Sequence, residues 1–140
     1  MPDAKQKYFD PRRESVKAAR DFTATTLARW GLDDSGEIRL CVSELATNAL
    51  AHGSEPGRGF LVRLESDDEH VRLEVHDSRD PHQQLPKVAH PAPSDTRGRG
   101  LLIVEALAAD WGVEHRNPRG KVIWTRFRAT PRTSAGAQPC

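Results

Sequence analysis

Apolar residues recur at helical spacing in the first part of the chain. One set repeats every three or four positions and predicts an amphipathic helix over about 11–30: Val16, Ala19, Phe22, Leu27 and Trp30. Asp10 and Pro11 predict its start, as an N-cap followed by proline at the first helical position, and Gly31 predicts its end. A short edge strand over 5–9 is expected before it.

A second helix is predicted from Glu37 to about His52, ending at Gly53. Its apolar stripe has the same period and is expected to be buried: Ile38, Val42, Leu45, Ala46, Ala49 and Leu50. A third, shorter helix is predicted over 101–110, directly after a glycine-rich segment. Each of the three helices therefore needs a partner for one apolar face.

Apolar and polar residues alternate over 60–65 and again over 71–76, which predicts two strands in an antiparallel hairpin. A second hairpin is predicted from 111–116 and 122–128, around a turn at 117–120. Paired strands and one-faced helices together predict a two-layer α/β sandwich. We expect one mixed, mainly antiparallel sheet with the three helices on one face.

The length of 140 residues matches a single domain. We expect residues 1–128 to form this domain and 129–140 to be a disordered C-terminal tail, too polar to bury enough surface. No stretch reaches the roughly 18 apolar residues of a membrane span, and the start lacks the apolar segment of a secretory signal. Two cysteines, Cys41 and Cys140, make no disulfide framework. These features predict a cytoplasmic protein with no membrane association.

The charges of the chain nearly cancel. Lysine and arginine number 21 and aspartate and glutamate 20, which gives a formal net charge of +1. Polybasic nucleic-acid-binding proteins carry a large positive excess. We therefore expect no direct contact with nucleic acid.

Three polar residues share one face of the second predicted helix, because they are spaced by four: Glu44, Asn48 and His52. Mg²⁺ prefers oxygen ligands and usually takes only one or two from protein. Asn48 is therefore a candidate metal ligand, and Glu44 a candidate general base for a water or an incoming hydroxyl. The competing interpretation is a solvated helix face that carries these residues by chance.

Asp77 stands at the end of the second predicted strand, where a long loop begins. A carboxylate at a strand end that borders a crevice can accept a hydrogen bond from an exocyclic amine, such as that of adenine. Aspartate is also common after strands simply as a turn former, and this alternative stays open.

Residues 78–97 contain four prolines and no apolar period, which favours a functional loop. The segment Arg97-Gly98-Arg99-Gly100 follows and opens the third helix. Glycines allow close approach of the backbone, and a helix N-terminus favours phosphate. The two arginines could add charge-assisted contacts. No Gly-Lys-Ser/Thr follows, so the segment is not a Walker A loop, and a flexible loop before a helix is the competing interpretation.

In this order the segments resemble the histidine kinase-like ATPase superfamily, and within it the anti-sigma-factor serine/threonine kinases common in actinobacteria. Residues 43–53 (Ser-Glu-Leu-Ala-Thr-Asn-Ala-Leu-Ala-His-Gly) are similar to the family's N-box. Val75-His76-Asp77 is similar to the start of its first glycine box, and 98–104 to its second. The resemblance spans about 9–127.

The resemblance implies a Bergerat-type fold that binds ATP and Mg²⁺. Asn48 would ligate Mg²⁺, Glu44 would be the catalytic carboxylate, Asp77 would bind adenine, and 78–97 would be the ATP lid. The implied cofactor-binding residues are Asn48, Asp77, Arg97, Gly98, Arg99, Gly100 and Leu101.

The resemblance also implies a function. Such a protein binds a sigma factor and phosphorylates a serine on a small anti-anti-sigma antagonist, and its relatives suggest a homodimer. This chain departs from the family in Ser78-Arg79-Asp80, where glycines are common, and in Val122, where threonine is common. The departures favour an alternative, a non-catalytic regulator of the same fold that senses ATP or is indifferent to it.

Overall fold

A computed structural model describes residues 3–32, 36–53, 57–67, 69–78, 99–115 and 120–129. Its elements in chain order are β1 (Asp3–Phe9), α1 (Glu14–Arg29), α2 (Glu37–Asn48), the π-helical turn η1 (Ala49–Gly53), β2 (Phe60–Ser66), β3 (His70–Asp77), α3 (Arg99–Leu107), β4 (Asp110–His115) and β5 (Lys121–Arg128). No helix in the described ranges is long and apolar enough to cross a membrane.

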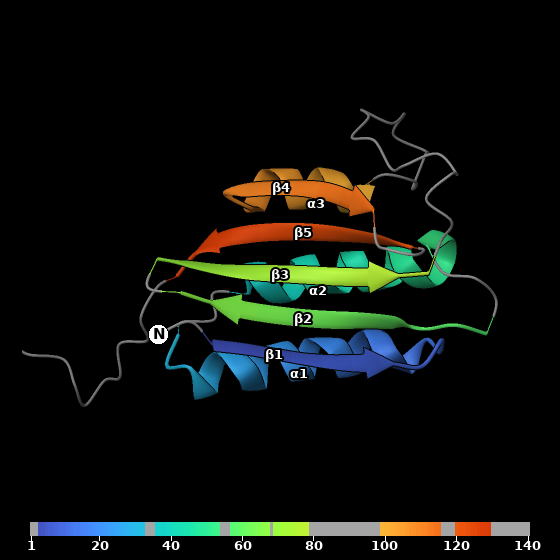
Figure 1. The fold of residues 1–140 in the computed structure, drawn as a ribbon, viewed down its shortest axis with the longest axis horizontal. Helices are drawn as coiled ribbons and strands as arrows, with labels where there is room; N and C mark the ends of the chain where they lie inside the picture. The colour runs from blue at the N-terminus through green and yellow to red at the C-terminus, as the bar shows by residue number, and fades with distance from the viewer. Residues whose placement is uncertain are drawn as a thin grey trace, which may run out of the picture.

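The five strands form one sheet in the order β1-β2-β3-β5-β4. The helices lie together behind this sheet, on one of its faces (Figure 1). The two-layer sandwich predicted from the sequence is thereby confirmed. Each described pairing is antiparallel, so the sheet has no parallel part in these residues, although a mixed sheet was expected.

The ends of α1 illustrate where local signals succeed and fail. Gly31 follows the helix with a φ of 71°, a left-handed conformation that glycine adopts without strain, as predicted. The predicted N-cap at Asp10 is wrong, because the helix begins only at Glu14, with Arg13 as its N-cap. The Asp10 carbonyl instead accepts hydrogen bonds from the Arg12 N–H and the Ser15 hydroxyl, so a tight turn separates Pro11 from the helix.

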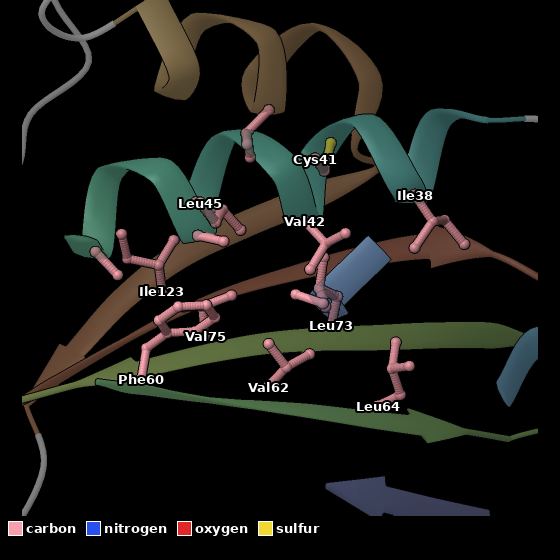
Figure 2. Packing of buried hydrophobic residues seen from close by; sticks show 14 of the residues in the cluster. Ile38, Cys41, Val42, Leu45, Phe60, Val62, Leu64, Leu73, Val75 and Ile123 are labelled. Atoms are coloured by element: carbon pink, nitrogen blue, oxygen red, sulfur yellow. The ribbon is translucent and has the colours of Figure 1, made fainter. Parts of the chain in front are cut away.

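The core fills the space between the helices and the sheet. Val42 and Leu45 of α2 point toward the strands, where Leu73, Val75 and Ile123 point back (Figure 2). All five side chains are buried. The apolar stripe predicted for the second helix is therefore the face that packs on the sheet, except that Leu50 is only partly buried. Trp30, a core candidate from the sequence, is likewise only partly buried.

The remaining boundaries differ from expectation by a few residues. The second helix is α-helical only through Asn48 and then widens into η1. The third helix begins at Arg99, inside the glycine-rich segment that was predicted to open it, and ends at Leu107. Ala129, assigned to the tail, donates its N–H to the Glu69 carbonyl, and the rest of that segment lies outside the described residues.

Candidate functional site

Several elements end or begin at one end of the sheet. β3 ends at Asp77, which pairs with Lys121 at the start of β5. The turn η1 packs against β3, and Figure 1 shows it, as the green turn after α2, beside the arrowhead of that strand. The last residue of α2, Asn48, is therefore held at the same end of the molecule as Asp77.

The third helix begins at this end as well. Only two residues separate α3 from β4, and the two elements pack together, so they run in opposite directions. β4 ends at His115, which lies opposite Lys121 in the sheet. The beginning of α3 therefore faces the same end as Asp77 and Asn48. Residues from three parts of the chain that sequence analysis selected separately thus converge.

Asn48 and Glu44 lie one turn apart on α2, and both side chains are half-buried. Neither side chain makes a hydrogen bond or ion pair with another residue in the described ranges. An amide oxygen and a carboxylate left available in this way are hard donors of the kind Mg²⁺ accepts, with phosphates and water completing the shell. The two residues therefore fit a magnesium-nucleotide site.

Glu44 also affects the pKa of the Cys41 thiol on the same helix. Burial raises the pKa of Cys41 to about 12, and the negative charges of Glu37 and Glu44 raise it further in the same direction. A thiol with so high a pKa stays protonated at neutral pH, and the thiolate is the reactive form. Cys41 is therefore a packing residue of α2 and not part of the chemistry of the site.

Asp77 is engaged by a residue that sequence analysis did not select. The Lys121 Nζ lies 2.6 Å from the Asp77 Oδ2, and the two side chains are only 5% and 3% exposed. Both residues face the helices, because the alternation of β5 puts Lys121 on the same side as the buried Ile123 and Phe127. The alternation of buried residues at 123, 125 and 127 is visible in the sequence. Extended back by two positions, it predicts that the Lys121 side chain lies on the core side of the strand.

The structure describes only part of the glycine-rich segment 97–100. Arg99 is the first residue of α3, and Gly100 and Leu101 continue the helix, so the predicted helix N-terminus is confirmed. Arg97 and Gly98, together with 79–96 of the predicted lid, lie outside the described residues. The phosphate-binding role of this segment stays a prediction.

The described end of the sheet thus offers three kinds of group. A half-buried amide and carboxylate on α2 can hold a metal or accept a proton, and a buried carboxylate and ammonium on the strands can accept and donate hydrogen bonds. The beginning of a nine-residue helix contributes backbone N–H groups. A nucleoside triphosphate can use all of these groups: the metal ligand and the backbone N–H groups for its phosphates, and the hydrogen-bonding pair for its base.

This chain is similar to known proteins in sequence and in fold. Residues 9–127 match the family model described as the histidine kinase-like ATPase domain. The chain is also 25% identical over 121 residues to anti-sigma F factors from two strains of Clostridium botulinum, Alaska E43 and Eklund 17B. Each alignment covers 80% of this chain and 85% of the relative.

A similar solved structure is the crystal structure of the RsbU and RsbW domains of Rv1364c from Mycobacterium tuberculosis. The TM-score is 0.68, with 21% sequence identity. The match covers 94% of this chain but only 35% of that longer one, so the chain spans about a third of its neighbour's length. At this level of identity the likeness concerns the fold.

Proposed function

The chain belongs to the histidine kinase-like ATPase domain family, and on that premise we propose that it is an ATP-binding anti-sigma factor with protein serine kinase activity. It holds a sigma factor and transfers the γ-phosphoryl group of ATP to a serine of a small anti-anti-sigma antagonist. The similarity to anti-sigma F factors supports the choice of partners. The observation that carries the proposal is that the end of α2, with Asn48 and Glu44 one turn before it, lies at the same end of the sheet as Asp77.

ATP binding is divided among the elements that meet there. Asp77 accepts a hydrogen bond from the adenine amine, and the amides from Gly98 to Gly100, with Arg97 and Arg99, contact the phosphates. Leu101, which follows Gly100 in α3, is the remaining nucleotide-binding residue of this segment. Asn48 would hold Mg²⁺, and the ion would supply charge neutralisation at the phosphates.

Glu44 is the group that acts on the acceptor. A serine hydroxyl attacks phosphorus poorly unless its proton is removed as the new O–P bond forms. Glu44 accepts that proton, while the bond between the γ-phosphorus and the bridging oxygen breaks and ADP leaves. Its position one turn before Asn48 on α2 supports this role.

Glu44→Gln tests this role, because glutamine keeps the size and polarity of the side chain but cannot accept the proton. We expect the variant to bind Mg-ATP as the parent does and to lose about 10²–10⁴-fold in phosphoryl transfer. The measurement is transfer of radiolabel from γ-labelled ATP to antagonist-type proteins encoded in the same genome. Glu37→Gln, on the exposed first turn of the same helix, is the matched control and should label normally.

A second candidate function is a partner-binding regulator without kinase activity. The observation that favours it is the segment Ser78-Arg79-Asp80 directly after Asp77, where glycines are common in the family. The two candidates differ in one result. If the parent binds Mg-ATP but leaves each candidate antagonist unlabelled, the kinase proposal is wrong and the binding module is retained.

A further inference from the structure

The ammonium of Lys121 is the most deeply buried cationic group that the structure describes. Its side chain is 5% exposed, and it lies on the helix-facing side of the sheet at the start of β5. In the described ranges it has one polar partner, the Asp77 carboxylate at 2.6 Å. An ammonium carries three N–H donors, so one contact leaves two of them to be satisfied.

Buried donors are seldom left without an acceptor, because an unsatisfied donor destabilises the fold and a charged one does so more strongly. The remaining donors of Lys121 therefore call for an acceptor at this end of the sheet. The ammonium also stands against the carboxylate that we assign to adenine. The acceptor is thus needed where the base of the nucleotide would lie.

We propose that Lys121 is a specificity-determining residue that donates a hydrogen bond to N1 of adenine, while Asp77 accepts one from the N6 amine. This inference rests on the proposed function, since it concerns the base of the bound nucleotide. The exocyclic amine and N1 are neighbours on the adenine edge, as a donor beside an acceptor. Asp77 and Lys121 present the complementary acceptor and donor, side by side.

The pair is held rigidly enough to discriminate between bases. Asp77 and Lys121 are direct partners across the antiparallel ladder of β3 and β5, so backbone hydrogen bonds fix their Cα separation, and the buried ion pair joins their side chains. Guanine presents an acceptor at position six and a donor at position one, which opposes both groups. Sites that leave buried polar groups mismatched reject the wrong ligand strongly, by about 10⁴-fold in well-studied cases.

Base analogues test the inference on the unaltered protein, so that no variant has to fold. In 1-deaza-ATP a C–H replaces N1 and removes the acceptor proposed for Lys121. Titration calorimetry with the Mg²⁺ complexes should show 1-deaza-ATP binding about tenfold to hundredfold more weakly than ATP, as expected for loss of a hydrogen bond to a charged group. The control is 7-deaza-ATP, altered away from this edge, which should bind within about threefold of ATP.

Measuring the same two nucleotides on Lys121→Met gives a double-mutant-type cycle of protein and ligand. Methionine keeps much of the side chain's length and apolar stem but has no donor. If Lys121 reads N1, the variant should bind ATP and 1-deaza-ATP equally well. If the variant does not fold, the analogue ratio in the parent decides by itself. Equal affinities of the parent for ATP and 1-deaza-ATP would overturn the role of Lys121 while leaving ATP binding intact. Binding of neither ATP nor its analogues would instead refute the proposed function, and this inference with it.

Discussion

Two ion-pair clusters lie a few residues apart on β3, on opposite faces of the sheet. On the helix-covered face, Asp77 and Lys121 are almost completely buried. On the open face, Glu74 is 15% exposed and contacts the Arg72 Nε at 2.6 Å and the His76 Nε2 at 2.8 Å. The Arg72 guanidinium also lies 4.7 Å from the centre of the Trp124 ring.

The difference between these clusters lies in what satisfies the charges. Glu74 is surrounded by several donors on the open face, and its partners keep contact with solvent, so the network is complete without a ligand. Lys121 has one polar partner in the described residues and a buried side chain. A complete network suits a structural role, whereas a buried group with spare donors suits a binding site.

The largest effect on folding is expected at the buried pair. Lys121→Met leaves the Asp77 carboxylate buried without its countercharge, which should lower the free energy of unfolding by about 3–5 kcal/mol. Chemical denaturation near pH 7 measures it. The double variant Asp77→Leu with Lys121→Met should recover most of the loss, because replacing both charges removes the penalty. A loss below about 1 kcal/mol in the single variant would mean that water or another group reaches the pair.

An intermediate, pH-dependent effect is expected at Glu74. Its hydrogen bond with His76, followed by its contact with Arg72, lowers the pKa of Glu74 from 4.5 to about 2. A carboxyl whose pKa is depressed by folding stabilises the protein above its unfolded pKa, and this contribution is lost as the pH falls through the folded value. The relevant window therefore runs from about pH 4.5 down to about pH 2.

Glu74→Gln removes that titration. Between pH 5 and pH 2.5, the parent should lose about 2 kcal/mol more stability than the variant. Denaturant unfolding at the two pH values measures the difference. Glu65→Gln, on the same face but more exposed, is the control and should follow the parent. Parallel acid profiles for the parent and Glu74→Gln would show that the open-face network does not act through this carboxylate.

The smallest effect is expected at an exposed pair on the same sheet. The Arg126 guanidinium nitrogen Nη2 lies 3.2 Å from the Asp110 Oδ2, and the two side chains are 45% and 50% exposed. Solvent screens such pairs, so Arg126→Gln should change the free energy of unfolding by no more than about 0.5 kcal/mol. The Arg126–Asp110 pair and the two clusters on β3 thus represent three degrees of side-chain burial. A loss as large as that of Lys121→Met would break the link between burial and energetic importance.

Much of the fold follows from periodic patterns that depend on nearby residues. The stripe on α2 and the alternation in β2 and β3 each place a buried face correctly, because one packed layer imposes the period. Asp10 shows the limit of local signals: it has the chemistry of an N-cap, but a turn uses its carbonyl and delays the helix. Trp124 shows another limit, since size alone does not reveal that its ring lies under Arg72 on the open face.

Spacing within one helix was enough to select Glu44 and Asn48, which lie one turn apart on α2, and their roles stay predictions. The contact between Lys121 and Asp77 joins residues 44 positions apart and depends on the register of β3 with β5. Neither strand specifies that register by itself, because β4 and α3 come between them in the chain. The predicted strand began at 122, one residue after Lys121, so sequence analysis gave this lysine no role.

Binding of a magnesium-nucleotide complex at this end of the sheet should depend on Asn48. Isothermal titration of the parent with Mg-ATP should show saturable binding at one site per chain, and a chelator should abolish it. Asn48→Ala should remove the Mg²⁺-dependent binding while the fold survives, because the half-buried amide has no partner in the described residues. If the variant binds Mg-ATP as tightly as the parent, or if the parent binds none, this end of the sheet is not a magnesium-nucleotide site held by Asn48.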